Sequence, residues 1–185
     1  TTEIYTLSLH DALPISLGPD VNESYRAFGV NEHGEIRFGL SAIKGMGAPA
    51  ADAIVAERLK NGPYKTIFDF AERVDFSCVN RKAFETLALS GGFDSFGIRR
   101  EQFFGKNSKG DTFLDILVRY GQLYQQEQRE AATSLFGGAE AVEIATPPIP
   151  EAESWSTIER LNKERELVGI RSEERRVGKE CRSRW

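Results

Sequence analysis

Residues 43–54 read IKGMGAPAADAI, two glycines one residue apart followed by a proline and a run of small and apolar residues. Glycine has no Cβ, so Gly45 and Gly47 allow a sharp turn and a close approach of the backbone to another molecule. Pro49 suits the first turn of a helix, and residues 61–63, Asn-Gly-Pro, supply a stop. The segment therefore predicts a tight hairpin that opens into a helix of about three turns.

An apolar residue, a Gly-x-Gly hairpin and a following helix make the pattern of a helix-hairpin-helix motif. Free amides of such a hairpin, and of the helix N-terminus, point at a phosphate. These contacts address the DNA backbone and not the bases, so they hold any duplex alike. The alternative is a packing corner in which the glycines serve only backbone geometry. The candidate DNA-binding residues here are Lys44, Gly45, Met46, Gly47 and Ala48.

A second helical hairpin is expected over residues 67–90. Thr66 can cap its first helix and Asn80 its second, which would end at Gly91. Residues 37–109 carry 12 basic and 8 acidic side chains, in a chain whose net charge is −4. This local excess suits a phosphate-binding face, although a solvated basic surface would look the same. Arg73 lies in this cluster, and the candidate DNA-binding residues in it are Lys65, Arg81 and Lys82.

The remaining pattern predicts a mainly α fold. A small β hairpin precedes the tandem helix-hairpin-helix domain, with Phe28 and Val30 facing Ile36 and Phe38. Apolar residues at helical spacing indicate a longer helix over residues 113–124. Residues 139–153 are expected to form a mobile or extended linker, and a final, truncated helix should follow, with its packing partner missing.

The order of these motifs resembles the bacterial DNA polymerase III alpha subunit. The resemblance implies the end of the fingers, a tandem helix-hairpin-helix region that holds the duplex behind the active site, and a clamp-binding segment. It also implies template-directed DNA synthesis and Mg²⁺ for the full-length polymerase, whose metal-binding palm lies outside this chain, and partnership with the other holoenzyme subunits. The matching segments are Leu17–Ser24, Ile36–Leu40, Ile43–Gly47, Gly62–Lys65, Ile67–Phe70, Val79–Lys82 and Gly91–Asp94.

The resemblance also places a sliding-clamp peptide at Ser134, Leu135 and Phe136. Two neighbouring apolar side chains can anchor such a peptide in a pocket. The leading glutamine usual in that peptide is replaced by Ala132. The alternative is that Leu135 and Phe136 belong to the core at the end of the preceding helix.

Both ends of the chain look foreign. The first 15 residues resemble a translation of a sequencing adapter, and residues 171–181 can be encoded by the complementary strand. The expected division is 1–16 adapter-like, 17–39 end of fingers, 40–97 tandem helix-hairpin-helix, 98–137 helical extension with the clamp-like peptide, 138–170 linker and helix, and 171–185 adapter-like.

The sequence lacks the residues that several classes of protein function require. Between the two foreign-looking ends Cys78 is the only cysteine, so neither a disulfide framework nor a cysteine metal cluster is expected. No catalytic residue, metal site or membrane span is predicted, and a cytoplasmic location is expected. Two alternatives to a replicative polymerase fragment stay open. One is a non-enzymatic helix-hairpin-helix scaffold of repair or recombination, and the other is an error-prone relative of the same polymerase.

Overall fold

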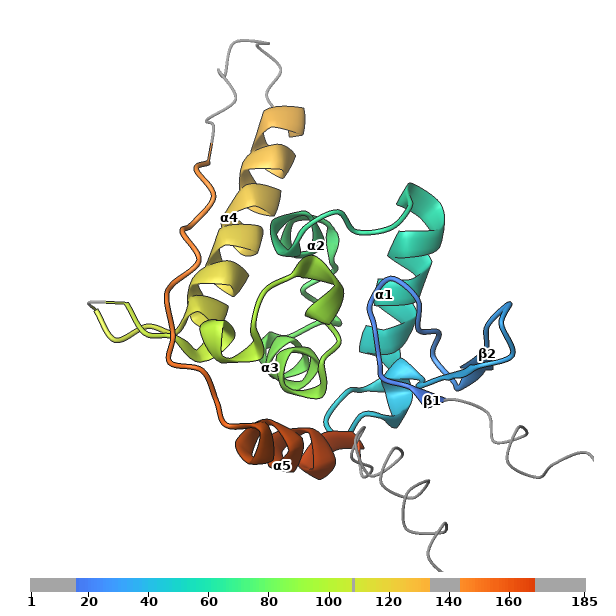
Figure 1. The fold of residues 1–185 in the computed structure, drawn as a ribbon. Coiled ribbons are helices and arrows are strands. Elements are labelled where there is room, and N and C mark those ends of the chain that lie inside the picture. Colours follow the sequence, from blue (N-terminus) through green and yellow to red (C-terminus); the bar gives the residue numbers. More distant parts are fainter. Residues whose placement is uncertain (1–15, 108, 134–143, 169–185) are drawn as a thin grey trace, which may run out of the picture.

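A computed structural model describes residues 16–107, 109–133 and 144–168. Figure 1 shows α2 and α3 between α1 on one side and α4 on the other, with α5 below α3. The fold is mainly α, as the sequence predicts. The elements are β1 (Ser16–Leu17), β2 (Gly29–Val30), β3 (Ile36–Arg37), η1 (Leu40–Ala42), α1 (Ala48–Asn61), α2 (Ile67–Arg73), α3 (Arg81–Ser90), η2 (Asp94–Phe96), η3 (Arg100–Phe104), α4 (Phe113–Thr133) and α5 (Thr157–Val168).

The small sheet contains the expected hairpin. β2 and β3 pair antiparallel with Val30 opposite Ile36, and the Phe28 and Phe38 rings meet edge to face at 4.7 Å. The sheet order is β1-β3-β2, because β1 adds a parallel strand at the other edge of β3. That strand was not predicted, and it includes Ser16, which the sequence assigned to the adapter-like segment.

Local signals set the helix ends where the sequence predicted them. The Thr66 side chain accepts a hydrogen bond from the amide of Asp69 at 3.1 Å, and Asn80 accepts one from Ala83 at 3.0 Å. These bonds satisfy amides that have no partner inside their helices. Gly91 ends α3 in the left-handed region, at φ 90°, where a side chain would be strained.

Aromatic rings fill the centre of the molecule. The Phe70 ring contacts those of Phe84 and Phe93 at 5.3 and 5.1 Å, and Phe103 bridges Phe93 to Phe113. All five rings are fully buried. Offset and edge-to-face contacts of this kind stabilise a core beyond the area that they bury. One core therefore joins both helical hairpins to α4.

The helix α4 continues to Thr133, well beyond the expected region of apolar spacing. At Gly121 it packs tightly on its neighbours, because a Cβ there would lie 2.7 Å from Phe76 Cζ and closer still to the Ala71 carbonyl. The Gln125 side chain donates to the carbonyl oxygens of Glu72 and Val74, at 3.0 and 2.7 Å. These contacts hold α4 against the end of α2.

Residues 144–156 form no regular structure and run back along α4 toward α5 (Figure 1). They are held on η3, since Gln102 donates to the Pro150 carbonyl at 3.1 Å and Phe104 meets Trp155 at 5.5 Å. The final helix, expected to lack a packing partner, instead packs on α3 and buries Leu161 and Val168. The described part of the linker is thus fixed on the domain.

Candidate nucleic-acid interface

The first hairpin lies between η1 and α1. The amide of Met46 donates to the Ile43 carbonyl at 3.0 Å, which closes the turn, and both side chains are buried. Gly45 adopts φ 92°, so this position needs glycine. Gly47 is extended at φ −72° and forms the N-cap of α1. Met46, predicted as a DNA-binding residue, therefore closes the turn with its amide and has its side chain in the core.

Three backbone amides of this hairpin have no acceptor among the described residues: those of Gly45, Gly47 and Ala48. The first turn of α1 has no acidic side chain to offset the positive end of the helix. Besides Met46, the Lys44 amide is also engaged, because it donates its N–H to the carbonyl oxygen of Leu167 in α5, at 2.9 Å. The Lys44 side chain is exposed.

Residues of α3 complete the site. A Cβ built on Gly45 would lie 3.3 Å from Thr86 Oγ1 and 4.0 Å from Lys82 Cε. The Lys82 ammonium group forms an ion pair with Glu85 at 3.3 Å and remains largely exposed. The Thr86 hydroxyl is buried and has no hydrogen-bond partner among the residues that the structure describes. The second hairpin unit thus places Lys82, which the sequence assigned to the basic cluster around that unit, beside the first hairpin, together with a hydroxyl that was not predicted.

Two predicted residues lie elsewhere or are already paired. Lys65 follows the C-terminus of α1, whereas the hairpin precedes the N-terminus of this 14-residue helix, which is about 21 Å long. Arg81 is bonded to Asp115 and to Glu85, at 2.5 and 3.2 Å. Arg73, from the same basic cluster, bonds Glu57 and Asp69 and holds the turn between α1 and α2.

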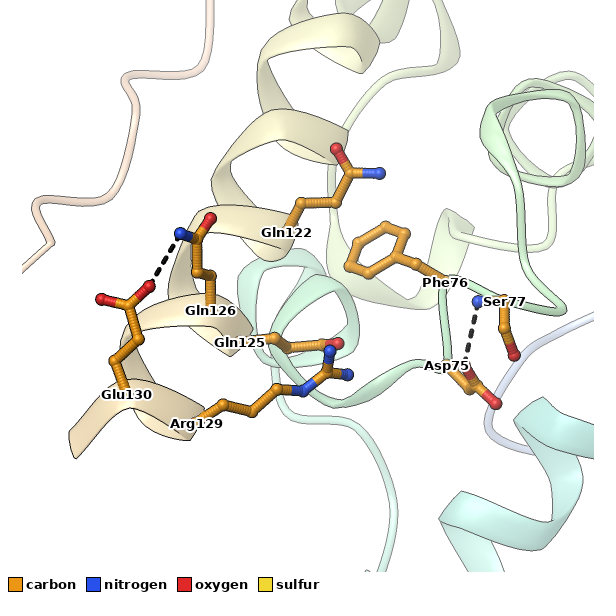
Figure 2. Close-up of a pocket in the computed structure, with 8 residues that line it drawn as sticks. All are labelled: Asp75, Phe76, Ser77, Gln122, Gln125, Gln126, Arg129 and Glu130. Atoms are coloured by element: carbon orange, nitrogen blue, oxygen red, sulfur yellow. Dashed lines mark hydrogen bonds between the residues drawn. The ribbon is translucent and has the colours of Figure 1, made fainter. Parts of the chain in front are cut away.

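The second hairpin loop borders a pocket of about 580 Å³ against α4. Figure 2 shows the side chains of Gln122, Gln125 and Arg129 on α4 facing Phe76 and Asp75 of the loop. Asp75 accepts the Ser77 amide at 2.9 Å, and bonds from Ser77 lower the pKa of its carboxyl group. Carboxylates at Asp75 and Glu130 disfavour a phosphate here, so the candidate interface is the first hairpin.

Other predictions fall outside this interface. No group of three or more His, Cys, Asp or Glu side chains in the described residues could hold a metal ion. No helix within that part of the chain is long and apolar enough to cross a membrane. The clamp-like residues Ser134, Leu135 and Phe136, and the adapter-like segments 1–15 and 171–185, lie outside the described residues.

Residues 16–103 match the model of the helix-hairpin-helix motif. DNA polymerase III subunit alpha of Haemophilus influenzae is 36% identical over 159 residues, which covers 82% of this chain and 13% of that protein. The fit is similar for the subunits of Chlamydia trachomatis, 35% identical over 87% of this chain, and of Thermus aquaticus, 36% identical over 83%. The chain fits a fragment of the DNA polymerase III alpha subunit. It spans 12 to 13% of the length of these relatives.

The acidic partners of the basic residues were not predicted from the sequence. Glu85 stands three positions after Lys82 and four after Arg81, a spacing that places side chains on one helix face, so its role was readable from the sequence. Asp115 and Leu167 are 34 and 123 positions from the residues that they bond, Arg81 and Lys44. No local pattern reports contacts of that range.

Proposed function

We propose that this chain is a duplex-binding fragment of a DNA polymerase III alpha subunit, and that its first hairpin holds the DNA backbone. The observation that carries the proposal is the set of unpaired amides at Gly45, Gly47 and Ala48, with Lys44 and Lys82 beside them. Amides fixed at a helix N-terminus favour an anion, and a phosphate is the anion that every duplex repeats. The resemblance to named polymerase subunits supports the same reading.

The hairpin would act on the backbone and not on the bases. Its donors are main-chain groups, which carry no sequence information, so binding is expected to be alike for unrelated duplexes. Lys44 and Lys82 would add charge, and binding would weaken as salt rises because phosphate contacts release counterions. A polymerase that moves along its product requires contacts of this sequence-independent kind.

The test compares Gly47→Val with Gly18→Val in the whole chain. Gly47 has extended geometry and only Pro49 Cδ near a built Cβ, at 3.6 Å, whereas Gly45→Val would be strained at φ 92°. Gly18 has open space around it and serves as the matched control. We expect Gly47→Val to stay folded and to lose about tenfold in affinity for any duplex, as for one lost backbone contact. Unchanged affinity would exclude the hairpin as the contact.

The whole protein's activity belongs to the same proposal. Template-directed synthesis, a metal-binding palm with Mg²⁺ and a cytoplasmic setting would come with the full-length polymerase. The alternatives are a non-enzymatic scaffold of repair or recombination and the error-prone relative of this polymerase. Reading the genomic DNA upstream of Leu17 separates the scaffold from both polymerases, because only they require an encoded palm in the same frame.

The sliding clamp and the other holoenzyme subunits are the proposed protein partners. Leu135 and Phe136 would anchor the clamp contact, with Ser134 before them. Replacing Leu135 and Phe136 with alanine should abolish clamp binding, because two apolar anchors dominate a weak peptide contact. The thermal midpoint should be nearly unchanged if the two side chains serve only this contact. Restoring a glutamine by Ala132→Gln should tighten it. If the double alanine variant loses stability and still binds the clamp, Leu135 and Phe136 are core residues and not the anchors of the clamp contact.

A further inference from the structure

A buried ion pair fastens α5 to the rest of the domain. Arg100 Nη1 donates to Glu164 Oε2 at 2.9 Å, and the two side chains are only 12% and 7% exposed. Arg100 also bonds Asp94 at 2.6 Å and the carbonyl oxygen of Leu89 in α3 at 3.3 Å. Nearby carboxylates raise the pKa of Arg100 although burial opposes this. The guanidinium group thus joins α5 to η2 and to the end of α3.

The last turn of α5 reaches the first hairpin. Leu167 lies three residues after Glu164, and its carbonyl oxygen accepts the Lys44 amide at 2.9 Å. Val168 is buried against the same core. Carbonyls in the last turn of a helix have no partner within it, so this bond satisfies Leu167 as well as Lys44. The position of α5 therefore affects the position of Lys44, the residue that precedes Gly45.

We propose that Glu164 is a positioning residue for DNA binding: by pairing with Arg100 it holds α5 so that Leu167 fixes Lys44 and the hairpin. The inference rests on the proposed function for the role of the hairpin. Glu164 touches no DNA in this account. Its effect comes through the Lys44–Leu167 bond, which removes one conformational freedom of the hairpin before a duplex arrives. A binding loop ordered in advance has less ordering cost at the moment of binding.

A comparison of Glu164 with Glu166 separates the positioning effect from the effect of removing a negative charge. Glu164 and Glu166 lie on one helix, and replacing either with alanine removes one negative charge from the chain. Glu166 is exposed and forms no ion pair within the described residues. Electrostatic repulsion of DNA alone predicts that both variants bind duplex slightly more tightly. If Glu164 positions the hairpin, Glu164→Ala should weaken duplex binding, whereas Glu166→Ala should not.

The experiment measures the affinity of the whole chain and of both variants for one duplex at one salt concentration. We expect Glu164→Ala to bind about fivefold more weakly and Glu166→Ala to bind the same or more tightly. Glu164→Gln keeps an acceptor oxygen for Arg100 and should recover most of the loss. If Glu164→Ala is unfolded at the working temperature, all variants are compared at a lower temperature at which circular dichroism shows that they are folded. Equal tightening by both charge removals would overturn the proposal.

Hydrogen exchange without DNA separates this inference from the proposed function. Releasing α5 should speed exchange of the Lys44 amide by about tenfold or more, while the Glu166→Ala variant leaves it unchanged. If the wild-type chain binds no duplex, the proposed function fails, and this exchange rate alone decides whether Glu164 positions the hairpin. An unchanged rate in Glu164→Ala would show that α5 does not fix Lys44.

Discussion

Arg81 Nε donates to Asp115 Oδ1 across 2.5 Å, joining the first residue of α3 to the first turn of α4. Thr112 donates its hydroxyl to the other carboxylate oxygen at 2.5 Å. These bonds hold the pKa of Asp115 down to about 2. An arginine that the sequence assigned to DNA is therefore engaged by a carboxylate of its own chain.

Asp115→Asn should raise the affinity for duplex DNA. The change weakens the bond from Asp115 to Arg81, so the guanidinium group keeps only its exposed pair with Glu85 and is more available to a phosphate. Asp111→Asn is the matched control, because it removes the same charge but releases Arg119 in place of Arg81. At low salt we expect a gain of about threefold for Asp115→Asn over the control, a typical value for one exposed charge pair. Equal affinities would mean that Arg81 does not contact the duplex.

The same pair should make the fold sensitive to acid. The pKa of Asp115 is lower in the folded chain than the ordinary value, so its contribution is present above about pH 4 and is lost as the pH falls toward about 2. Because Arg81 is half exposed, we expect about 1 kcal/mol. Urea unfolding at pH 6 and pH 2.5 should show a smaller loss for Asp115→Asn than for wild type. An identical loss would contradict this assignment.

Thr86→Val should stabilise the chain. The Thr86 hydroxyl is buried and has no partner in the described part of the chain, and valine keeps the shape of threonine while removing this polar group. We expect a gain of about 1 kcal/mol, seen as a higher thermal midpoint. Ser90→Ala, on the same helix, removes a buried hydroxyl that does bond, to the Leu87 carbonyl, and should lower the midpoint. A destabilised Thr86→Val would reveal a partner for this hydroxyl.

Gly121→Ala should destabilise the chain, although alanine favours helices over glycine by about 1 kcal/mol. A Cβ at residue 121 would lie 2.7 Å from Phe76 Cζ and against the backbone of Ala71. Overpacking against backbone should cost about 2 kcal/mol or more. Denaturant unfolding measures it, with Gly18→Ala as the control in open space. A stabilised Gly121→Ala would show that α4 can move away from α2.

The parts of the fold that the sequence predicted are those with local causes. Thr66 and Asn80 cap the helices that they precede, and Gly91 ends the second, because these effects involve residues within one turn. The antiparallel hairpin followed from alternating apolar residues around a turn. The parallel pairing of β1 did not, since no local pattern records which edge a distant strand joins.

In the candidate site, too, the features with local causes were predicted from the sequence and those that depend on distant residues were not. The Gly-x-Gly segment predicted the turn and its free amides, because backbone geometry depends on the glycines themselves. Charge alone could not separate Lys82, which lies beside Gly45, from Lys65, which lies beyond the far end of α1. The return of α5 to Lys44 depends on the buried pair of Arg100 and Glu164, 64 positions apart, and only the folded chain brings them together.

The most direct test of the account follows backbone amide resonances by NMR as duplex DNA is added to the isotope-labelled chain. The amides of Gly45, Gly47 and Ala48 should shift most, because they have no acceptor among the described residues and can therefore bond a phosphate. The amide of Lys44 should shift less, since Leu167 already accepts it. The same shifts should appear with a duplex of unrelated sequence. Saturable binding that leaves these three amides unmoved would contradict the account.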